Sequence, residues 1–521
     1  MEIGNNPDHF MFRNSLIRNR FRLLIAIGLA GCQPTIPSQS PSRGLGKPSD
    51  AVSAEKSSQL DDDAQRNLVG SSRKKNTLAD GTSLSSPTAP VADRFRPDDH
   101  RPLYDEARIT AAGIRIYESK RLRLFTDVAN TETEVEKLPE LVDRLYEELE
   151  GYFGTLPPNR ARTEFQMNGY LIRDLERFRN HGLLPEEFTF EHGVQRRNEF
   201  WVRDQEFDYY RRHLLLHEAT HCFMNYTPDV DAPIWYLEGM AEYFAAHRIV
   251  NSSTRFRVMP TSSIEFEGFG RLAIIRRDVA AAKTPTIASI ISWPATTFTK
   301  ADPYAWSWAL CAFLDGTPRY RERFRKLGAA TQDARFEGEF LAAFPPEDRD
   351  FATEWQLFLA NLQYGYDLER AAIDFKKGTL LNPDQPEASV SVTAERGWQS
   401  SGVLLEAGRD YEVVAEGQFT LTQRSGDEQP WVSEPQGISF RYFDGRPIGT
   451  LIGCVRAEEG PTGGVEDSML QTITLGNRRT FRAPVSGTLY LRLNDAWNSL
   501  SDNQGDVRVI VRQVNSTGQT D

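Results

Sequence analysis

A chain of 521 residues is long enough for two or three domains, and its 39% hydrophobic and 11% aromatic residues can supply buried cores. The formal net charge of −12 argues against a nucleic-acid partner, because binding phosphates requires a basic surface. No apolar run is long enough to span a bilayer as a helix.

The N-terminus has the pattern of an export signal over residues 1–31. Four arginines precede a short apolar run at residues 23–31, and Cys32 follows directly. The ending Leu29-Ala30-Gly31-Cys32 resembles the bacterial lipoprotein signal, which implies that Cys32 is acylated and becomes the mature N-terminus. An ordinary cleavable signal with an incidental cysteine is the alternative. We therefore expect an exported protein that a lipid anchors to a bacterial cell membrane, in the periplasm or at the cell surface.

Residues 32–100 are predicted to be a disordered linker. The stretch is rich in Ser, Pro, Gly, Asp and Lys. Such a composition cannot bury enough apolar surface to offset the loss of chain entropy on folding. A flexible segment of this length fits a domain that a lipid holds near a membrane.

Residues 101–382 have the patterns of a mixed α and β domain. Alternating apolar residues indicate strands, and apolar residues at a spacing of three or four indicate helices. In chain order we expect strands within 113–128, a helix within 131–154, a strand at 165–172, helices at 208–225 and 233–247, and further helices up to about residue 377.

The helix predicted at 208–225 contains the pattern H-E-x-x-H. Positions i and i+4 share one face of a helix, so His217 and His221 can offer two imidazoles to one metal. Glu218 projects about 100° further round the helix, where it could hold a water bound to that metal. The pattern thus supplies two zinc ligands and a general base.

A catalytic zinc ion needs a third protein ligand. The third histidine of a metzincin is missing, because Met224 and Thr227 stand where its glycine and histidine would be. Glu238 and Glu242 instead follow at i and i+4 of the next predicted helix. Their spacing alone does not decide between them.

The order His217-Glu218-x-x-His221, sixteen residues, then Glu238-Gly239-Met240-Ala241-Glu242 resembles the gluzincin metallopeptidases, and in particular a bacterial peptidase-MA-type subgroup. The resemblance covers roughly residues 108–370, with its motifs within 213–247. It implies an α+β zincin-like domain in which Glu238 is the third zinc ligand. It also implies that Glu242 hydrogen-bonds a zinc-binding histidine and fixes its orientation.

The gluzincin resemblance also requires a hydrogen-bond donor for the tetrahedral oxyanion. Tyr304 is our candidate, and core packing beside Trp306 and Trp308 is the alternative. We expect His213 to lie near the ligands or on the surface without binding the metal. We expect His247 to face solvent and Cys222 to fill core space.

Residues 383–515 change pattern to short alternating runs separated by Gly, Asp and Asn, which is typical of an all-β antiparallel sandwich. The loop at 494–506 resembles the calcium loop of LecA-type galactose-binding lectins. The resemblance covers about residues 386–514, and a polar turn is the alternative for the loop. Asp502 stands where those lectins have asparagine, which suits calcium but puts sugar contacts in doubt. The implied calcium ligands are Asp495, Asp502, Asn503 and the carbonyls of Ser499 and Leu421.

These features lead to one hypothesis and two alternatives. The hypothesis is a secreted, lipid-anchored zinc metallopeptidase that hydrolyses peptide or protein substrates, with a lectin-like domain that binds a glycan. The first alternative is a non-catalytic lectin-like binding protein with a structural or vestigial zinc domain. The second is hydrolysis of a non-peptide amide, such as a cell-wall cross-link, at the same site.

Overall fold

The computed structural model describes residues 95–129, 134–226, 232–251, 253–329, 336–421, 430–458 and 468–514. The predicted signal, Cys32 and most of the predicted linker lie outside these residues. The last residues of that linker, 95–100, are described and pack against the domain. Arg96 is buried and donates to the carbonyl of Thr163 at 2.8 Å, and His100 lies 2.6 Å from the Glu199 carboxylate.

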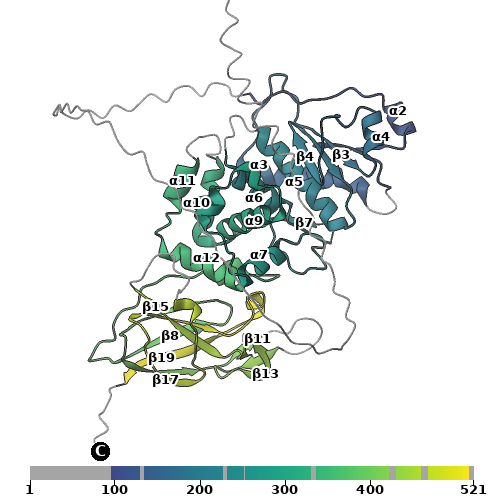
Figure 1. The fold of residues 1–521 in the computed structure, drawn as a ribbon. Coiled ribbons are helices and arrows are strands. Elements are labelled where there is room, and N and C mark those ends of the chain that lie inside the picture. The colour runs from purple at the N-terminus through teal and green to yellow at the C-terminus, as the bar shows by residue number, and fades with distance from the viewer. Residues whose placement is uncertain are drawn as a thin grey trace, which may run out of the picture. The chain divides into compact units, whose positions relative to one another are not determined.

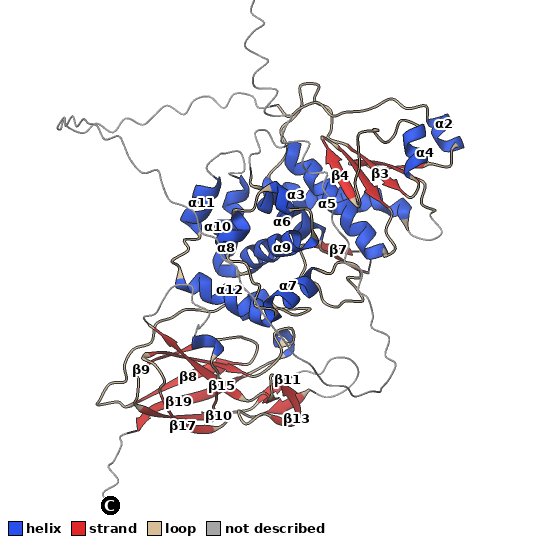
Figure 2. Cartoon of the chain, in the orientation of Figure 1, coloured by secondary structure: helices blue, strands red, loops and turns tan. Residues whose placement is uncertain are grey.

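A five-stranded mixed sheet forms the first part of the described fold (Figure 2). Three central strands are parallel, and an antiparallel strand lies at each edge, in the order β1-β2-β3-β5-β4. All six residues of β3 are buried, as expected for a central strand covered on both faces. The strands are β1 (Arg115–Glu118), β2 (Leu122–Thr126), β3 (Met167–Ile172), β4 (Gly193–Arg196) and β5 (Glu199–Arg203).

Helices cover both faces of this sheet (Figure 1). On one face, α3 (Leu138–Phe153) and α5 (Asp208–Tyr226) share a core with residues of β2, β3 and β5. On the other face, Ile109 of α2 (Glu106–Ala111) and Phe178 of α4 (Leu175–Asn180) share a core with Tyr170 and Trp201. The expected helix within 131–154 thus begins at Leu138, after a short 3₁₀ turn at Val135–Lys137.

The helix α6 (Ile234–Ala245) packs against both α5 and α9 (Ala301–Gly316). Gly239 makes the contact with α9 close: a Cβ atom there would lie 2.6 Å from Sγ of Cys311 and 2.7 Å from the carbonyl oxygen of Ser307. Only glycine allows this approach. The remaining elements of this part are β6 (His247–Val250), β7 (Ser253–Phe256), α7 (Arg271–Ala280), α8 (Ile287–Ile291), α10 (Pro318–Ala329), α11 (Phe336–Ala343), α12 (Arg349–Asn361) and α13 (Leu368–Ala371).

Two four-stranded antiparallel sheets follow, with orders β17-β10-β19-β8 and β16-β15-β18-β9. Apolar residues of both sheets form one shared core, so this part is an all-β sandwich. Two small hairpins, β11–β12 and β13–β14, accompany it. The strands are β8 (Glu387–Thr393), β9 (Gln399–Leu405), β10 (Asp410–Glu416), β11 (Phe419–Leu421), β12 (Trp431–Ser433), β13 (Ile438–Phe443), β14 (Arg446–Ile448), β15 (Leu451–Ala457), β16 (Ile473–Thr474), β17 (Arg478–Arg482), β18 (Gly487–Leu493) and β19 (Asp506–Val514).

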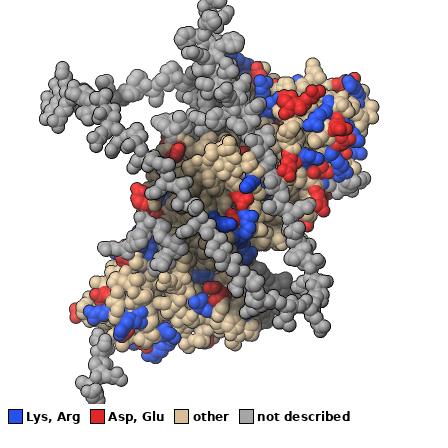
Figure 3. Space-filling model, viewed as in Figure 1, with Lys and Arg blue, Asp and Glu red and all other residues tan. Residues whose placement is uncertain are grey.

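The described chain therefore has a mixed α and β part followed by an all-β part, as the sequence patterns predict. Among the described residues, no helix combines the length and hydropathy that a bilayer span requires. On the face drawn in Figure 3, Lys and Arg side chains lie among Asp and Glu side chains.

The expectation that His247 faces solvent is wrong, because His247 is only 1% exposed. Its ring stacks on Tyr209 with 4.8 Å between centroids. Nδ1 lies 2.8 Å from the carbonyl of Ala245, and Arg212 donates to Nε2 at 3.2 Å. One ring nitrogen therefore donates and the other accepts, which fits a neutral imidazole. Burial lowers the pKa of His247 to about 3.

We predict that His247 makes the fold sensitive to acid. A histidine with a depressed folded-state pKa binds its proton mainly in the unfolded chain, so stability is lost as pH falls below about 6.5. Between pH 7 and pH 5 this one residue should cost about 2 kcal/mol of unfolding free energy. Urea unfolding at both pH values should show a smaller pH dependence in His247→Gln than in the wild type. Equal pH dependence in the two proteins would contradict this role.

Candidate metal centre

Three side chains converge between α5 and α6. The Nε2 atoms of His217 and His221 are 3.1 Å apart. One carboxylate oxygen of Glu238, Oε2, lies 3.3 Å from Nε2 of His217 and 3.2 Å from Nε2 of His221. All three residues are at most 2% exposed. The structure therefore brings together the three residues that the gluzincin resemblance assigned to zinc.

These distances suit a shared cation better than a set of hydrogen bonds. Oε2 of Glu238 can accept a hydrogen bond from each imidazole, but Nε2 of His217 and Nε2 of His221 then face each other at 3.1 Å with no acceptor between them. Zinc bonds of 2.0 to 2.2 Å in a tetrahedron place neighbouring ligand atoms about 3.3 to 3.6 Å apart. The three observed separations are at or slightly below that range. Two imidazoles and one carboxylate also form a donor set that catalytic zinc sites use.

Local sequence explains the alignment of these donors. His217 and His221 lie one turn apart on α5, and Glu238 lies one turn into α6, whose N-cap is Pro233. Burial raises the pKa of Glu238, but the neighbouring His221 and His217 lower it by a larger amount, so that it falls to about 2. The Glu238 carboxylate is therefore ionised near neutral pH and faces the two imidazoles as an anion.

Glu242 follows Glu238 by one turn of α6 and lies fully buried behind His217. Its Oε1 is 3.5 Å from Nδ1 of His217, without the hydrogen bond that the resemblance implied, and its Oε2 is 3.1 Å from Nε2 of His213. Arg271 donates to both carboxylate oxygens, at 2.8 and 3.0 Å. His213, His217 and Glu242 could by proximity hold a second metal. A second metal is disfavoured, because the positively charged Arg271 guanidinium already donates to both oxygens of Glu242.

His213 is completely buried beside the ligands, so the surface alternative for it is excluded. Arg271, the first residue of α7, was not anticipated from the sequence. It lies 29 residues after Glu242, and no local pattern links the two. Only the packing of α7 beside the cluster reveals their contact.

Glu218 lies on the same helix as both histidines and is 4% exposed. Its Oε2 is buried and has no hydrogen-bond partner among the described residues. Burial raises the pKa of Glu218 to about 8, and the nearby Glu238 and Glu242 act in the same direction. On its other side is Gly193 of β4, where a Cβ atom would lie only 2.5 Å from Oε1 of Glu218.

Tyr304 lies in α9 with its ring centroid 6.3 Å from that of His217. Its hydroxyl donates to the carbonyl of Phe298 at 3.4 Å. Burial raises its pKa well above the ordinary value, so the hydroxyl keeps its proton near neutral pH. Tyr304 is thus buried in the core and also adjacent to the cluster.

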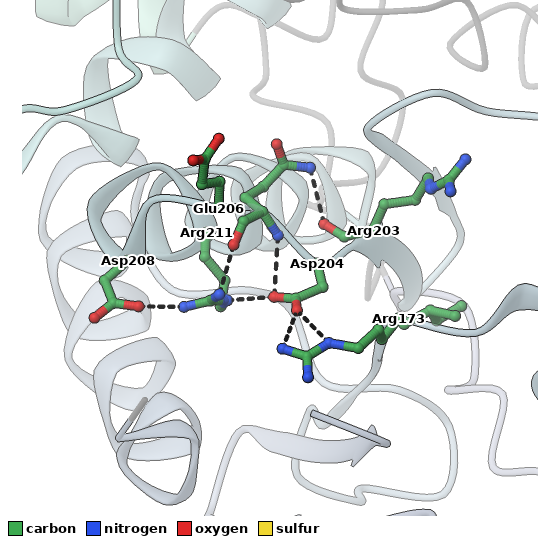
Figure 4. A pocket seen from close by; sticks show the side chains of 8 residues that line it. Arg173, Arg203, Asp204, Glu206, Asp208 and Arg211 are labelled. Atoms are coloured by element: carbon green, nitrogen blue, oxygen red, sulfur yellow. Dashed lines mark hydrogen bonds and ion pairs between the residues drawn. The ribbon is translucent and has the colours of Figure 1, made fainter. Parts of the chain in front are cut away.

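A separate cavity of about 340 Å³ lies at the carboxyl ends of β3 and β5 and at the start of α5 (Figure 4). None of the clustered histidines or glutamates lines it. Figure 4 shows that Asp204 lies between Arg173 and Arg211, which both pair with it. Because these charges satisfy one another, we assign no chemistry to this cavity.

The predicted calcium loop lies against β11. Backbone hydrogen bonds of 2.9 Å join Thr420 to Gln504 in both directions, which places the loop beside Leu421. Asp495 and Asn503 are buried, and the Asn503 amide donates to the Asp495 carboxylate at 3.0 Å. The carbonyl of Asp495 accepts from buried Arg492 at 2.6 Å. Ser499 and Asp502 lie at the short 3₁₀ turn Leu500–Asp502.

No protein-family model and no curated protein sequence matches the chain. The N-terminal domain of EclA, described as a PllA-like lectin, is 24% identical over 24% of this chain and 95% of its own, with a TM-score of 0.18. PliG of Aeromonas hydrophila, a periplasmic inhibitor of g-type lysozyme, is 12% identical over 25% of this chain and 84% of its own, with a TM-score of 0.14. Likenesses this weak establish neither a family nor a function.

We predict that Glu238→Ala weakens zinc binding by about 100-fold or more, because removing one of three protein ligands opens the site. Competition with a chromophoric chelator measures the affinity, and elemental analysis of the wild type should give about one zinc per chain. The matched control is Glu206→Ala, since Glu206 is an exposed glutamate that precedes α5. Equal zinc affinity in the two variants would contradict the assignment of Glu238.

Proposed function

We propose that the chain is a gluzincin-type zinc metallopeptidase that hydrolyses peptide bonds. One observation carries the proposal: three donor atoms, on His217, His221 and Glu238, lie 3.1–3.3 Å from one another. The buried carboxylate of Glu218 lies on the same helix and has an oxygen without a described hydrogen-bond partner. Ligands and a base are the two parts that such a hydrolase needs.

In this proposal His217, His221 and Glu238 hold the zinc. When bound, zinc supplies an acidified water and a polarised substrate carbonyl. Glu218 accepts a proton from the attacking water and then passes it to the leaving amine. Tyr304 keeps its proton at neutral pH and donates to the oxyanion, for which its hydroxyl would have to turn from Phe298.

The sheet offers a place for an extended peptide. β4 is an edge strand, so one side of its backbone is not paired within the sheet. A peptide can add to such an edge through main-chain hydrogen bonds. Because Gly193 of β4 lies directly against Glu218, a peptide on this edge would run past the general base.

We further propose that a lipid on Cys32 holds the enzyme at a bacterial membrane and that the sandwich binds a glycan. Calcium would be held by Asp495, Asp502, Asn503 and the carbonyls of Ser499 and Leu421. One observation supports this: Oδ1 of buried Asn503 has no hydrogen-bond partner among the described residues. The competing function, a non-catalytic lectin-like binding protein, relies on the same sandwich. Hydrolysis of a non-peptide amide is the other alternative, because it would use the same zinc site.

Glu218→Gln tests the hydrolase directly. The substitution removes the base but none of the zinc ligands, so zinc affinity should stay unchanged while hydrolysis falls by about 10²- to 10⁴-fold. Digestion of a peptide library, read by mass spectrometry, measures activity on zinc-loaded protein. Glu206→Gln should retain full activity. If zinc-loaded wild type and Glu218→Gln are equally inert, the binding-protein alternative replaces the hydrolase.

Gly193→Ala tests the contact between β4 and the base. The added methyl group would lie 2.5 Å from Oε1 of Glu218, so the buried carboxylate must move. We expect hydrolysis to fall by about 10-fold or more at unchanged zinc affinity, since misplacing a catalytic group costs rate. Gly151→Ala is the control, because a Cβ atom there meets nothing within 4 Å. Normal hydrolysis by Gly193→Ala would show that this contact does not set the position of Glu218.

A further inference from the structure

The Glu242 carboxylate connects three helices at the metal centre. It projects from α6 and meets Arg271 at the start of α7 and His213 on α5. Arg271 is 4% exposed and Glu242 is 0% exposed, so water does not screen their ion pair. Two parallel hydrogen bonds between a guanidinium and a carboxylate fix the plane of the carboxylate as well as its position.

The direction of each hydrogen bond then sets the histidine tautomers. An ionised carboxylate only accepts, so His213 must donate from Nε2. Nδ1 of His213 and Nδ1 of His217 are both buried and have no hydrogen-bond partner among the described residues. Nδ1 of His217 lies 3.5 Å from Oε1 of Glu242, which is an ion-pair contact and not a hydrogen bond. A proton on that nitrogen leaves the lone pair of Nε2 for a metal.

We propose that Arg271 and His213 are positioning residues that hold Glu242 against His217 and thereby direct Nε2 of His217 at the metal. The inference rests on the zinc site proposed above. It adds two residues that lie outside the set of three predicted zinc ligands. Both act through Glu242, Arg271 by clamping its two oxygens and His213 by a third hydrogen bond.

A role in positioning differs from a role in charge balance by the sign of its effect. Removing a positive charge near a cation favours binding of that cation, so a pure charge role predicts tighter zinc binding in Arg271→Met. Loss of positioning predicts weaker binding, because partners that orient a ligand typically contribute 10- to 100-fold in metal affinity. Arg271→Lys keeps the charge but loses the planar two-pronged contact.

The experiment measures zinc affinity and the visible spectrum of the cobalt-substituted full chain in these variants. Arg276→Met is the matched control, since Arg276 is exposed on the same helix and forms no ion pair with any residue that the structure describes. We expect Arg271→Met and Arg271→Lys to bind zinc about 10-fold or more weakly than wild type, with altered cobalt bands. Arg276→Met should match the wild type in both measurements.

Nitrogen NMR of the metal-free protein tests the tautomers, and should find the proton on Nδ1 in His217 and on Nε2 in His213. Unchanged or tighter zinc binding in the Arg271 variants overturns the inference, as does the opposite tautomer of His217. Should Arg271→Met not fold, Arg271→Lys decides. A wild type that binds zinc, with Arg271 variants like the control, refutes only this inference. A wild type that binds no zinc refutes the proposed function as well.

Discussion

The desolvated cluster of charge around His217 is the constraint on which the rest of this fold depends. Glu218, Glu238 and Glu242 are buried within two turns of two adjacent helices. Burying carboxylates is costly unless each finds an opposite charge or a full set of hydrogen bonds. Arg271 compensates Glu242, Glu238 lies against two imidazoles, and burial raises the pKa of Glu218 to about 8, so that Glu218 is mostly protonated at neutral pH. A divalent cation would balance the charge of Glu238 and favour the ionised form of Glu218.

The elements around the cluster pack closely against it and exclude water from it. Gly239 allows α9 to approach α6 closely, and α6 also packs against α5. The same close approach brings Tyr304 of α9 beside His217. The five-stranded sheet shares a core with α5. Gly193 of its edge strand β4 lies directly against the Glu218 carboxylate. Residues from four separate elements thus enclose one small volume.

Local spacing was enough to predict those parts of the site that lie on a single helix. The i and i+4 positions of His217 and His221 fix their shared face whatever surrounds them. The preference for Glu238 over Glu242 as third ligand rests on the family resemblance, because both glutamates have the right period, and it stays a prediction. Arg271 could not be predicted, since its contact with Glu242 joins two helices far apart in sequence. His247 was mispredicted for a related reason: a single polar residue after a helix carries no sign of the Tyr209 ring that covers it.

In the sandwich, period-two alternation predicted the strands, but it could not predict how the sandwich meets the helices. Tyr366, before α13, stacks on Trp497 of the sandwich at 5.8 Å between centroids. Arg492 lies 3.8 Å from the Trp497 ring centroid and is buried with it. Arg349 of α12 also donates to the carbonyls of Ala457 and Glu458. The hydrophobic core of the helical part therefore continues into the sandwich. Separating the two would expose aromatic rings and a buried guanidinium together, so the helical part depends on the sandwich for part of its own core.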